Sequence, residues 1–176
     1  FWGLCAAAAT GFSVQVAHLI GAGNFAGARK ILRQSITATL LFGSSLAAIG
    51  VFISDSLPGW LGGDEIIRKD SSVYFLIFSL FLPVLQMNFL ASGMFRCSGN
   101  MYIPSILNIL MCLLDIIFNF FLIFPKRQIE IMGLNIDIYG AGLGVKGAAL
   151  GTVLAELVTA GGMMWYLCYR SPILKL

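Results

Sequence analysis

Residues 105–124, SILNILMCLLDIIFNFFLIF, decide the fold of this chain. The stretch is almost entirely apolar, and it is long enough to cross about 30 Å of hydrocarbon as a helix. Its interior nevertheless contains Asn108, Asp115 and Asn119. At about 100° per residue, separations of seven and four positions place these three side chains within roughly 60° of one another. The stretch therefore predicts a membrane-spanning helix with one polar stripe.

The composition of the whole chain agrees with a membrane setting. Its 176 residues are 59% hydrophobic and 11% charged, and the mean hydropathy is +0.90, which is too apolar for a domain whose surface faces water. The net charge is +3, but the basic residues lie in short segments between apolar runs and form no basic face for nucleic acid. The sequence predicts an all-α fold, a polytopic bundle of transmembrane helices.

Five stretches are apolar enough to be membrane spans. We predict them at about residues 1–20, 34–56, 71–95, 101–124 and 147–169. Pro83 predicts a kink in the third span, because proline leaves the carbonyl four residues earlier without its helical hydrogen bond. After the fourth span, the alternating pieces 129–132 and 134–138 can pair as a small hairpin. The whole chain is thus expected to be one transmembrane unit.

The segments between the spans predict an orientation. We expect a basic connector at residues 24–33 on one side of the membrane, and an aqueous loop at 59–70 on the other. Lys and Arg divide almost evenly between the two sides, but all acids outside the spans fall on the side of the 59–70 loop. The side of the connector is therefore uniformly basic, and we expect it to face the cytoplasm.

Two carboxyl groups lie deep inside predicted spans. Asp115 and Glu156 are each about ten residues from either end, where an acid costs roughly 2.5–3.5 kcal/mol to insert and is a functional candidate by default. A site away from water favours the neutral form of a carboxyl, so either acid can act as a proton or cation switch. The alternative is a protonated acid that only hydrogen-bonds a neighbouring helix. Both interpretations stay open, and they are evenly balanced for Glu156.

Asparagines accompany these acids. Asn119 follows Asp115 by one turn, and its amide can either bind an ion together with the acid or hold the acid in place. Asn108 precedes Asp115 by two turns and fits a hydrogen bond between helices better than ion binding. Asn88, in the third span, is also more typical of packing than of a ligand.

The fifth span contains a second polar pair. Thr152 and Glu156 are one turn apart, and the small residues at 147–151 allow another helix to approach closely. The sequence GLGVKG at 142–147 matches a dinucleotide-binding pattern formally, but a membrane span follows it in place of a βαβ unit. No pattern of hydrolases or metal enzymes is present, the four cysteines lack zinc or disulfide spacing, and His18 is the only histidine. We therefore expect neither an enzyme nor a cofactor.

Four short strings, taken together, resemble the multidrug and toxic compound extrusion family, MATE. They are AHLIGAGN at 17–24, RCSGN at 96–100 with Pro104 after it, LIF at 122–124, and GVKGAALGT at 144–152. The resemblance implies a secondary transporter with two six-helix lobes, which exports cationic or amphipathic compounds in exchange for H⁺ or Na⁺. In that register, the five spans are helices two to six of the amino-terminal lobe. The first helix and the carboxy-terminal lobe would complete the protein.

The resemblance also implies a site and a setting. Helix five of the family typically carries an asparagine followed four residues later by an acid, whereas here Asp115 precedes Asn119. We expect Asp115, Asn119, Thr152 and Glu156 to bind the coupling ion or substrate, with Asp115 and Asn119 as the ligands if that ion is Na⁺. Asn108 and Asn88 are secondary candidates for the same site. The other expected partners are small cationic or amphipathic substrates and the lipid bilayer of the plasma (inner) membrane.

Two other functions are compatible with parts of the sequence. A lipid-linked oligosaccharide flippase of the same broad superfamily would need several Arg or Lys residues inside the lobe to meet pyrophosphate, and no predicted span has one in its interior. A non-transporting membrane subunit is also conceivable, in which the acids pair with a partner protein.

Overall fold

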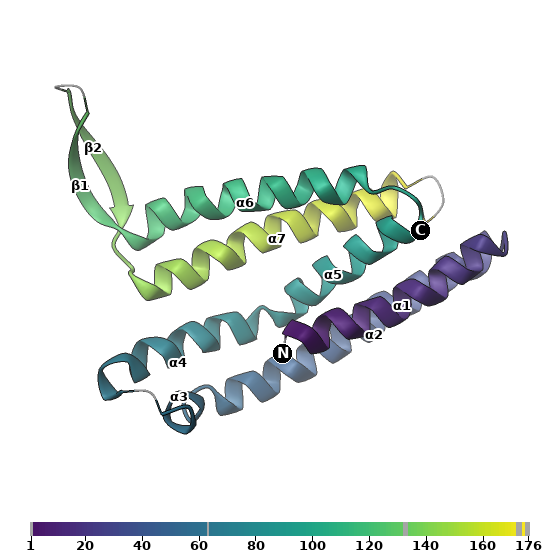
Figure 1. The fold of residues 1–176 in the computed structure, drawn as a ribbon, viewed down its shortest axis with the longest axis horizontal. Helices are drawn as coiled ribbons and strands as arrows, with labels where there is room; N and C mark the ends of the chain where they lie inside the picture. Colours follow the sequence, from purple (N-terminus) through teal and green to yellow (C-terminus); the bar gives the residue numbers. More distant parts are fainter. Residues whose placement is uncertain (1, 63, 132–133, 172–173, 175–176) are drawn as a thin grey trace.

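The chain forms a bundle of helices from which one β-hairpin protrudes (Figure 1). The computed structural model describes residues 2–62, 64–131, 134–171 and 174. Among these residues, four helices are long and apolar enough to cross a membrane, and one bent pair makes a fifth crossing if its two helices form one span. The predicted all-α transmembrane bundle is confirmed. Its elements are α1 (Trp2–Gly21), α2 (Phe25–Ile53), α3 (Leu57–Trp60), α4 (Glu65–Leu80), α5 (Leu82–Cys97), α6 (Tyr102–Ile123), β1 (Pro125–Ile131), β2 (Leu134–Ala141) and α7 (Val145–Tyr169).

Helix α5 lies in the centre of the bundle. Figure 1 shows α6 and α7 side by side on one edge and α1 and α2 side by side on the other, with α4 and α5 between them. Leu90, Met94 and Phe95 of α5 are fully or almost fully buried against side chains of α1, α2 and α7. In a membrane, such contacts hold helices together through close packing, because lipid tails are as apolar as the side chains. These three residues of α5 are therefore shielded from lipid.

The third predicted span is broken in the middle. Helices α4 and α5 meet at Phe81 at an angle of 50°. Pro83 has no N–H to donate to the carbonyl of Ser79, and this carbonyl accepts a hydrogen bond from the N–H of Phe81 instead. The kink predicted from Pro83 is confirmed, and it falls two residues before the proline.

Two helices begin well before the predicted spans. Helix α2 starts at Phe25 and is capped by Asn24, whose side chain accepts a hydrogen bond from the N–H of Gly27 at 2.9 Å. The prediction of a connector at 24–33 was therefore wrong, because these basic residues are helical. Helix α4 likewise includes the last part of the predicted 59–70 loop. Charged residues are compatible with helix wherever their side chains reach water.

The hairpin extends from the end of the bundle where α6 ends and α7 begins (Figure 1). Its strands pair antiparallel, with Gln128 opposite Asp137 and Ile131 opposite Leu134. The predicted hairpin is confirmed, except that Met132 lies outside the described residues.

Candidate functional site

Asn88 and Glu156 meet inside the bundle. Asn88 is buried on α5, Glu156 is half-buried in the middle of α7, and the two residues are 68 positions apart in sequence. The side-chain amide of Asn88 donates a hydrogen bond from Nδ2 to Oε2 of Glu156. Asn88, which was predicted to serve packing, is thus the donor that holds one of the two intramembrane acids.

Asp115 and Asn119 form a second pair on α6. The amide of Asn119 donates from Nδ2 to Oδ1 of Asp115 at 3.1 Å, as their one-turn spacing predicted. Both side chains are half-buried, and Asp115 lies close enough to Glu156 for their charges to interact. Two carboxylates that share a site repel each other when both are ionised. The two acids therefore lie near each other on the packed helices α6 and α7.

The carbonyl end of the Asn119 side chain faces α7. Its Oδ1 is buried without a hydrogen-bond partner among the described residues, and it lies so close to Gly151 that a Cβ added there would overlap it. Asn119 therefore presents its N–H group, rather than its oxygen, to Asp115. The predicted Na⁺ ligand pair of Asp115 and Asn119 would require this amide to turn its oxygen toward the acid.

Thr152 lies beside Glu156 but points back along its own helix. Its hydroxyl donates to the carbonyl of Ala148 at 3.2 Å. Thr152 and Glu156 also line a small cavity of about 10 Å³ that is bordered by Phe81, where α4 and α5 meet. That volume holds about one water molecule. Thr152 thus offers hydroxyl lone pairs next to the acid.

Glu156 also lines a larger cavity of about 390 Å³. Asn88, Ser92 and Arg96 contribute to its wall from successive turns of α5, and the exposed Asn108 contributes from α6. Asn108 therefore lines the same cavity as Glu156. The sequence had placed Asn108 on the same polar stripe as Asp115. Trp2 and Phe89 form an apolar part of the wall, with their rings edge to face at 5.4 Å.

Ser92 and Arg96 are polar residues of the cavity wall that were not predicted as site residues. Ser92 and Arg96 follow Asn88 by four and eight residues, which places all three on one face of α5. That signal was present in the sequence, but the predicted third span ended at residue 95, so Arg96 lay outside it. The structure extends α5 to Cys97 and includes Arg96 in its last turn.

The arrangement can hold a proton or a single cation. One oxygen of Glu156 accepts the hydrogen bond from the amide of Asn88, and Glu156 lines both cavities. Among the described residues, no group of three or more His, Cys, Asp or Glu side chains could hold a metal ion.

Comparison with known proteins identifies the family. The MatE family description matches residues 1–121. The chain belongs to the MatE family. This family consists of transporters rather than enzymes, and MatE membership together with the helices described above makes the chain a multi-pass integral membrane protein.

The individual proteins that resemble this chain share only a low sequence identity with it. The curated FAD transporter of Shewanella oneidensis is 26% identical over 126 residues, which cover 70% of this chain and 28% of that protein. Two crystal structures of a MATE protein, one in complex with MaD3S and one in the bent conformation, each match with a TM-score of 0.82 and 22% identity. The matches cover 99% and 98% of this chain and 36% of the solved chains, so this chain spans about a third of their length. At this identity the likeness shows a shared fold.

The hydrogen bond between Asn88 and Glu156 is expected to couple α5 to α7. In a double-mutant cycle of Asn88→Ala and Glu156→Ala in the full-length protein, we expect a coupling free energy of about 0.6–1.7 kcal/mol. The free energy of unfolding in bicelles measures it. A control cycle that pairs Ser92→Ala with Glu156→Ala is expected to give a value near zero, because Ser92 lines the same cavity without a described bond to the acid. Equal couplings in the two cycles would contradict the assignment.

Proposed function

We propose that the full-length protein is a secondary active transporter that exports cationic or amphipathic compounds, including drugs and toxic compounds, across the plasma (inner) membrane. The inward flow of H⁺ or Na⁺ drives this export. One observation carries the proposal: Glu156, held by Asn88, borders a cavity of about 390 Å³, with the carboxyl of Asp115 nearby on the adjacent helix. An intramembrane acid that faces a cavity is typical of ion and substrate pathways.

The side chains of the proposed site have different roles in binding the coupling ion. Glu156 and Asp115 supply the negative charge, whereas Asn88 and Asn119 hold the two carboxyls in position. Thr152 supplies a hydroxyl next to Glu156. A hydrogen bond from an amide is stronger to a charged carboxylate than to a neutral acid. Release of the cation therefore strengthens the contact between α5 and α7, and binding of the cation weakens it.

Because the bound ion changes the strength of the contact between α5 and α7, it can shift the equilibrium between two conformations of the transporter. A ligand shifts an equilibrium only through its different affinities for the two states. In a transporter built from two lobes, the ion and the substrate favour opposite orientations of the binding cavity. The present chain corresponds to helices two to six of the amino-terminal lobe, which its coverage of about a third of the solved MATE chains supports. The first helix and the carboxy-terminal lobe are the remaining parts, and both lobes are required for transport.

Arg96 favours a second class of substrate. It is the basic residue among the described side chains that line the large cavity, and a guanidinium matches the geometry of phosphate oxygens. The relative from Shewanella oneidensis is named an FAD transporter, and FAD contains a pyrophosphate. A flavin dinucleotide is therefore the alternative substrate. A single arginine is fewer than the several cations that an oligosaccharide flippase would need.

Transport driven by an ion gradient tests the proposal. The full-length protein is reconstituted into liposomes that contain either a cationic dye or FAD, and gradients of H⁺ and Na⁺ are applied separately. We expect dye movement to follow one of the two gradients and to stop when that gradient is collapsed with an ionophore. Movement of FAD instead of dye would favour the dinucleotide. If neither compound moves under either gradient, the proposal fails and a non-transporting membrane subunit becomes the favoured function.

A further inference from the structure

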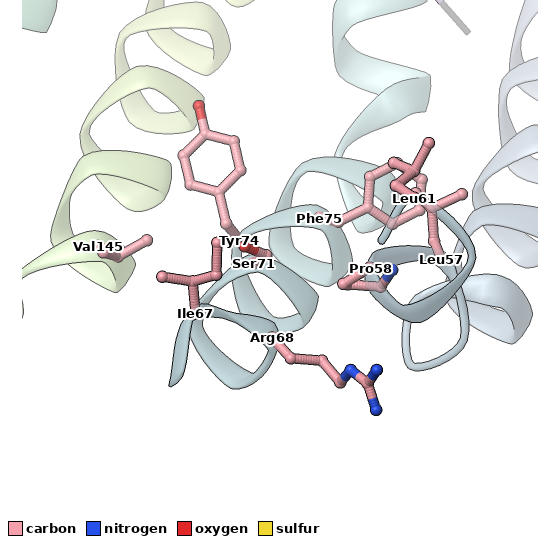
Figure 2. Close-up of a pocket in the computed structure, with 9 residues that line it drawn as sticks. All are labelled: Leu57, Pro58, Leu61, Ile67, Arg68, Ser71, Tyr74, Phe75 and Val145. Carbon is pink, nitrogen blue, oxygen red and sulfur yellow. The ribbon is translucent and has the colours of Figure 1, made fainter. Parts of the chain in front are cut away.

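A separate cleft of about 360 Å³ lies between the short helix α3, the first half of α4 and the start of α7 (Figure 2). Figure 2 shows Ile67 of α4 directed toward Val145 of α7, while Phe75 is directed toward Leu57 and Leu61 of α3. The wall is mainly aliphatic and aromatic, and its volume lies within the range of sites that bind small molecules.

The cleft extends from the charged first turns of α4 to its uncharged part. On α4, the charged residues end at Asp70, and the remainder of the helix has none. On α4, the wall runs from Ile67 to Phe75, which is about 12 Å along the helix axis at 1.5 Å per residue. Tyr74 in this wall and Trp60 of α3 are both exposed, as aromatic side chains often are at membrane interfaces. One end of the cleft is therefore polar and the other apolar.

The polar end is suited to a phosphate group. Arg68 and Ser71 are exposed side chains one turn apart, and both line the cleft. The guanidinium of Arg68 reaches across to α3, where its Nη2 is 3.4 Å from the position that a Cβ on Gly59 would take. None of the nine described residues that line the cleft is acidic. A guanidinium can bind phosphate oxygens through two parallel hydrogen bonds.

We propose that this cleft binds one anionic phospholipid from the surrounding leaflet. Its phosphate pairs with Arg68 and accepts a hydrogen bond from Ser71, and the first part of an acyl chain lies along Phe75 between α3 and α4. The bound lipid joins α3 to α4 and to the start of α7. This inference concerns a different surface from the acids of the proposed transport site and does not depend on the transport activity.

Lipid binding to the full-length protein tests this inference. The purified protein is titrated in detergent with phosphatidylglycerol or phosphatidylcholine, and bound lipid is counted by native mass spectrometry. We expect preferential binding of one phosphatidylglycerol, and Arg68→Gln is expected to weaken it about tenfold or more, as for the loss of a hydrogen bond to a charged group. Lys69→Gln is the matched control, because it removes the same charge one residue later, from an exposed side chain that does not line the cleft.

Two further measurements separate a lipid site from a simple anion site. Val145→Trp narrows the cleft on the side where Ile67 faces α7, without a change of charge, and is expected to weaken lipid binding. Glycerol 1-phosphate, added at the same concentration as the lipid, is expected not to displace it. Three results would each overturn the inference: equal binding of the two lipids, equal losses for Arg68→Gln and Lys69→Gln, or full displacement by glycerol 1-phosphate. Unchanged thermal unfolding of both charge variants shows that the fold is intact, since both side chains are exposed.

Discussion

Asp115→Asn in the full-length protein is expected to lower gradient-driven efflux by about 5- to 150-fold, the range that corresponds to a coupling free energy of about 1–3 kcal/mol. Asparagine has nearly the same shape as aspartate, and its oxygen can still accept the hydrogen bond that Asn119 donates. It can neither take up a proton nor attract a cation by charge. The variant therefore removes the chemistry of the acid while it preserves the packing of α6.

Glu156→Gln is the companion variant, and it is expected to cause a loss in the same range. Its side-chain oxygen can replace Oε2 as the acceptor for Asn88. Asp55→Asn is the control, because it makes the same chemical change at an exposed acid in the turn between α2 and α3. We expect control efflux at the wild-type rate in the liposome assay. A wild-type rate for both Asp115→Asn and Glu156→Gln would refute ion coupling through this site.

Gly147→Ala is expected to destabilise the protein by about 1–3 kcal/mol, the usual cost of overpacking. A Cβ at this position of α7 would lie 2.5 Å from the carbonyl oxygen of Leu122 and 2.7 Å from its carbonyl carbon. Both atoms belong to the backbone of α6, so no change of rotamer can relieve the contact. Helices α6 and α7 would have to separate, and the midpoint of thermal unfolding of the full-length protein in detergent would fall.

Gly161→Ala provides the matched control on the same helix. A Cβ added to Gly161 has no atom within 4 Å among the described residues. Alanine favours helix over glycine by about 1 kcal/mol, so this variant is expected to keep or raise the unfolding midpoint. Equal losses for the two variants would show that close packing against α6 is not the reason that position 147 needs a glycine.

The local features of this chain could be read from the sequence because they depend on the period of one helix. The pairing of Asp115 with Asn119 follows from a spacing of four residues, and the kink follows from the missing N–H of Pro83. The positions of charged residues predicted the ends of the helices less well. The segment at 24–33 was interpreted as a connector because of its basic residues, although it forms the first turns of helix α2 and buries Ala28 and Leu32 in the core.

The sequence alone was thus enough to predict the membrane setting, the helical class and the two intramembrane acids. The reason is that a chain in lipid must satisfy its backbone hydrogen bonds within long apolar helices, and that charged residues are rare inside them. Only the tertiary structure decided which residues surround those acids. Asn88 reaches Glu156 across 68 positions, and Arg96 joins the same cavity wall from the end of α5. The physical reason is that the packing of α5 against α7 is set by the fit of side chains from several helices at once. The period of a single helix shows which residues share a face, but it does not show which helix that face will meet.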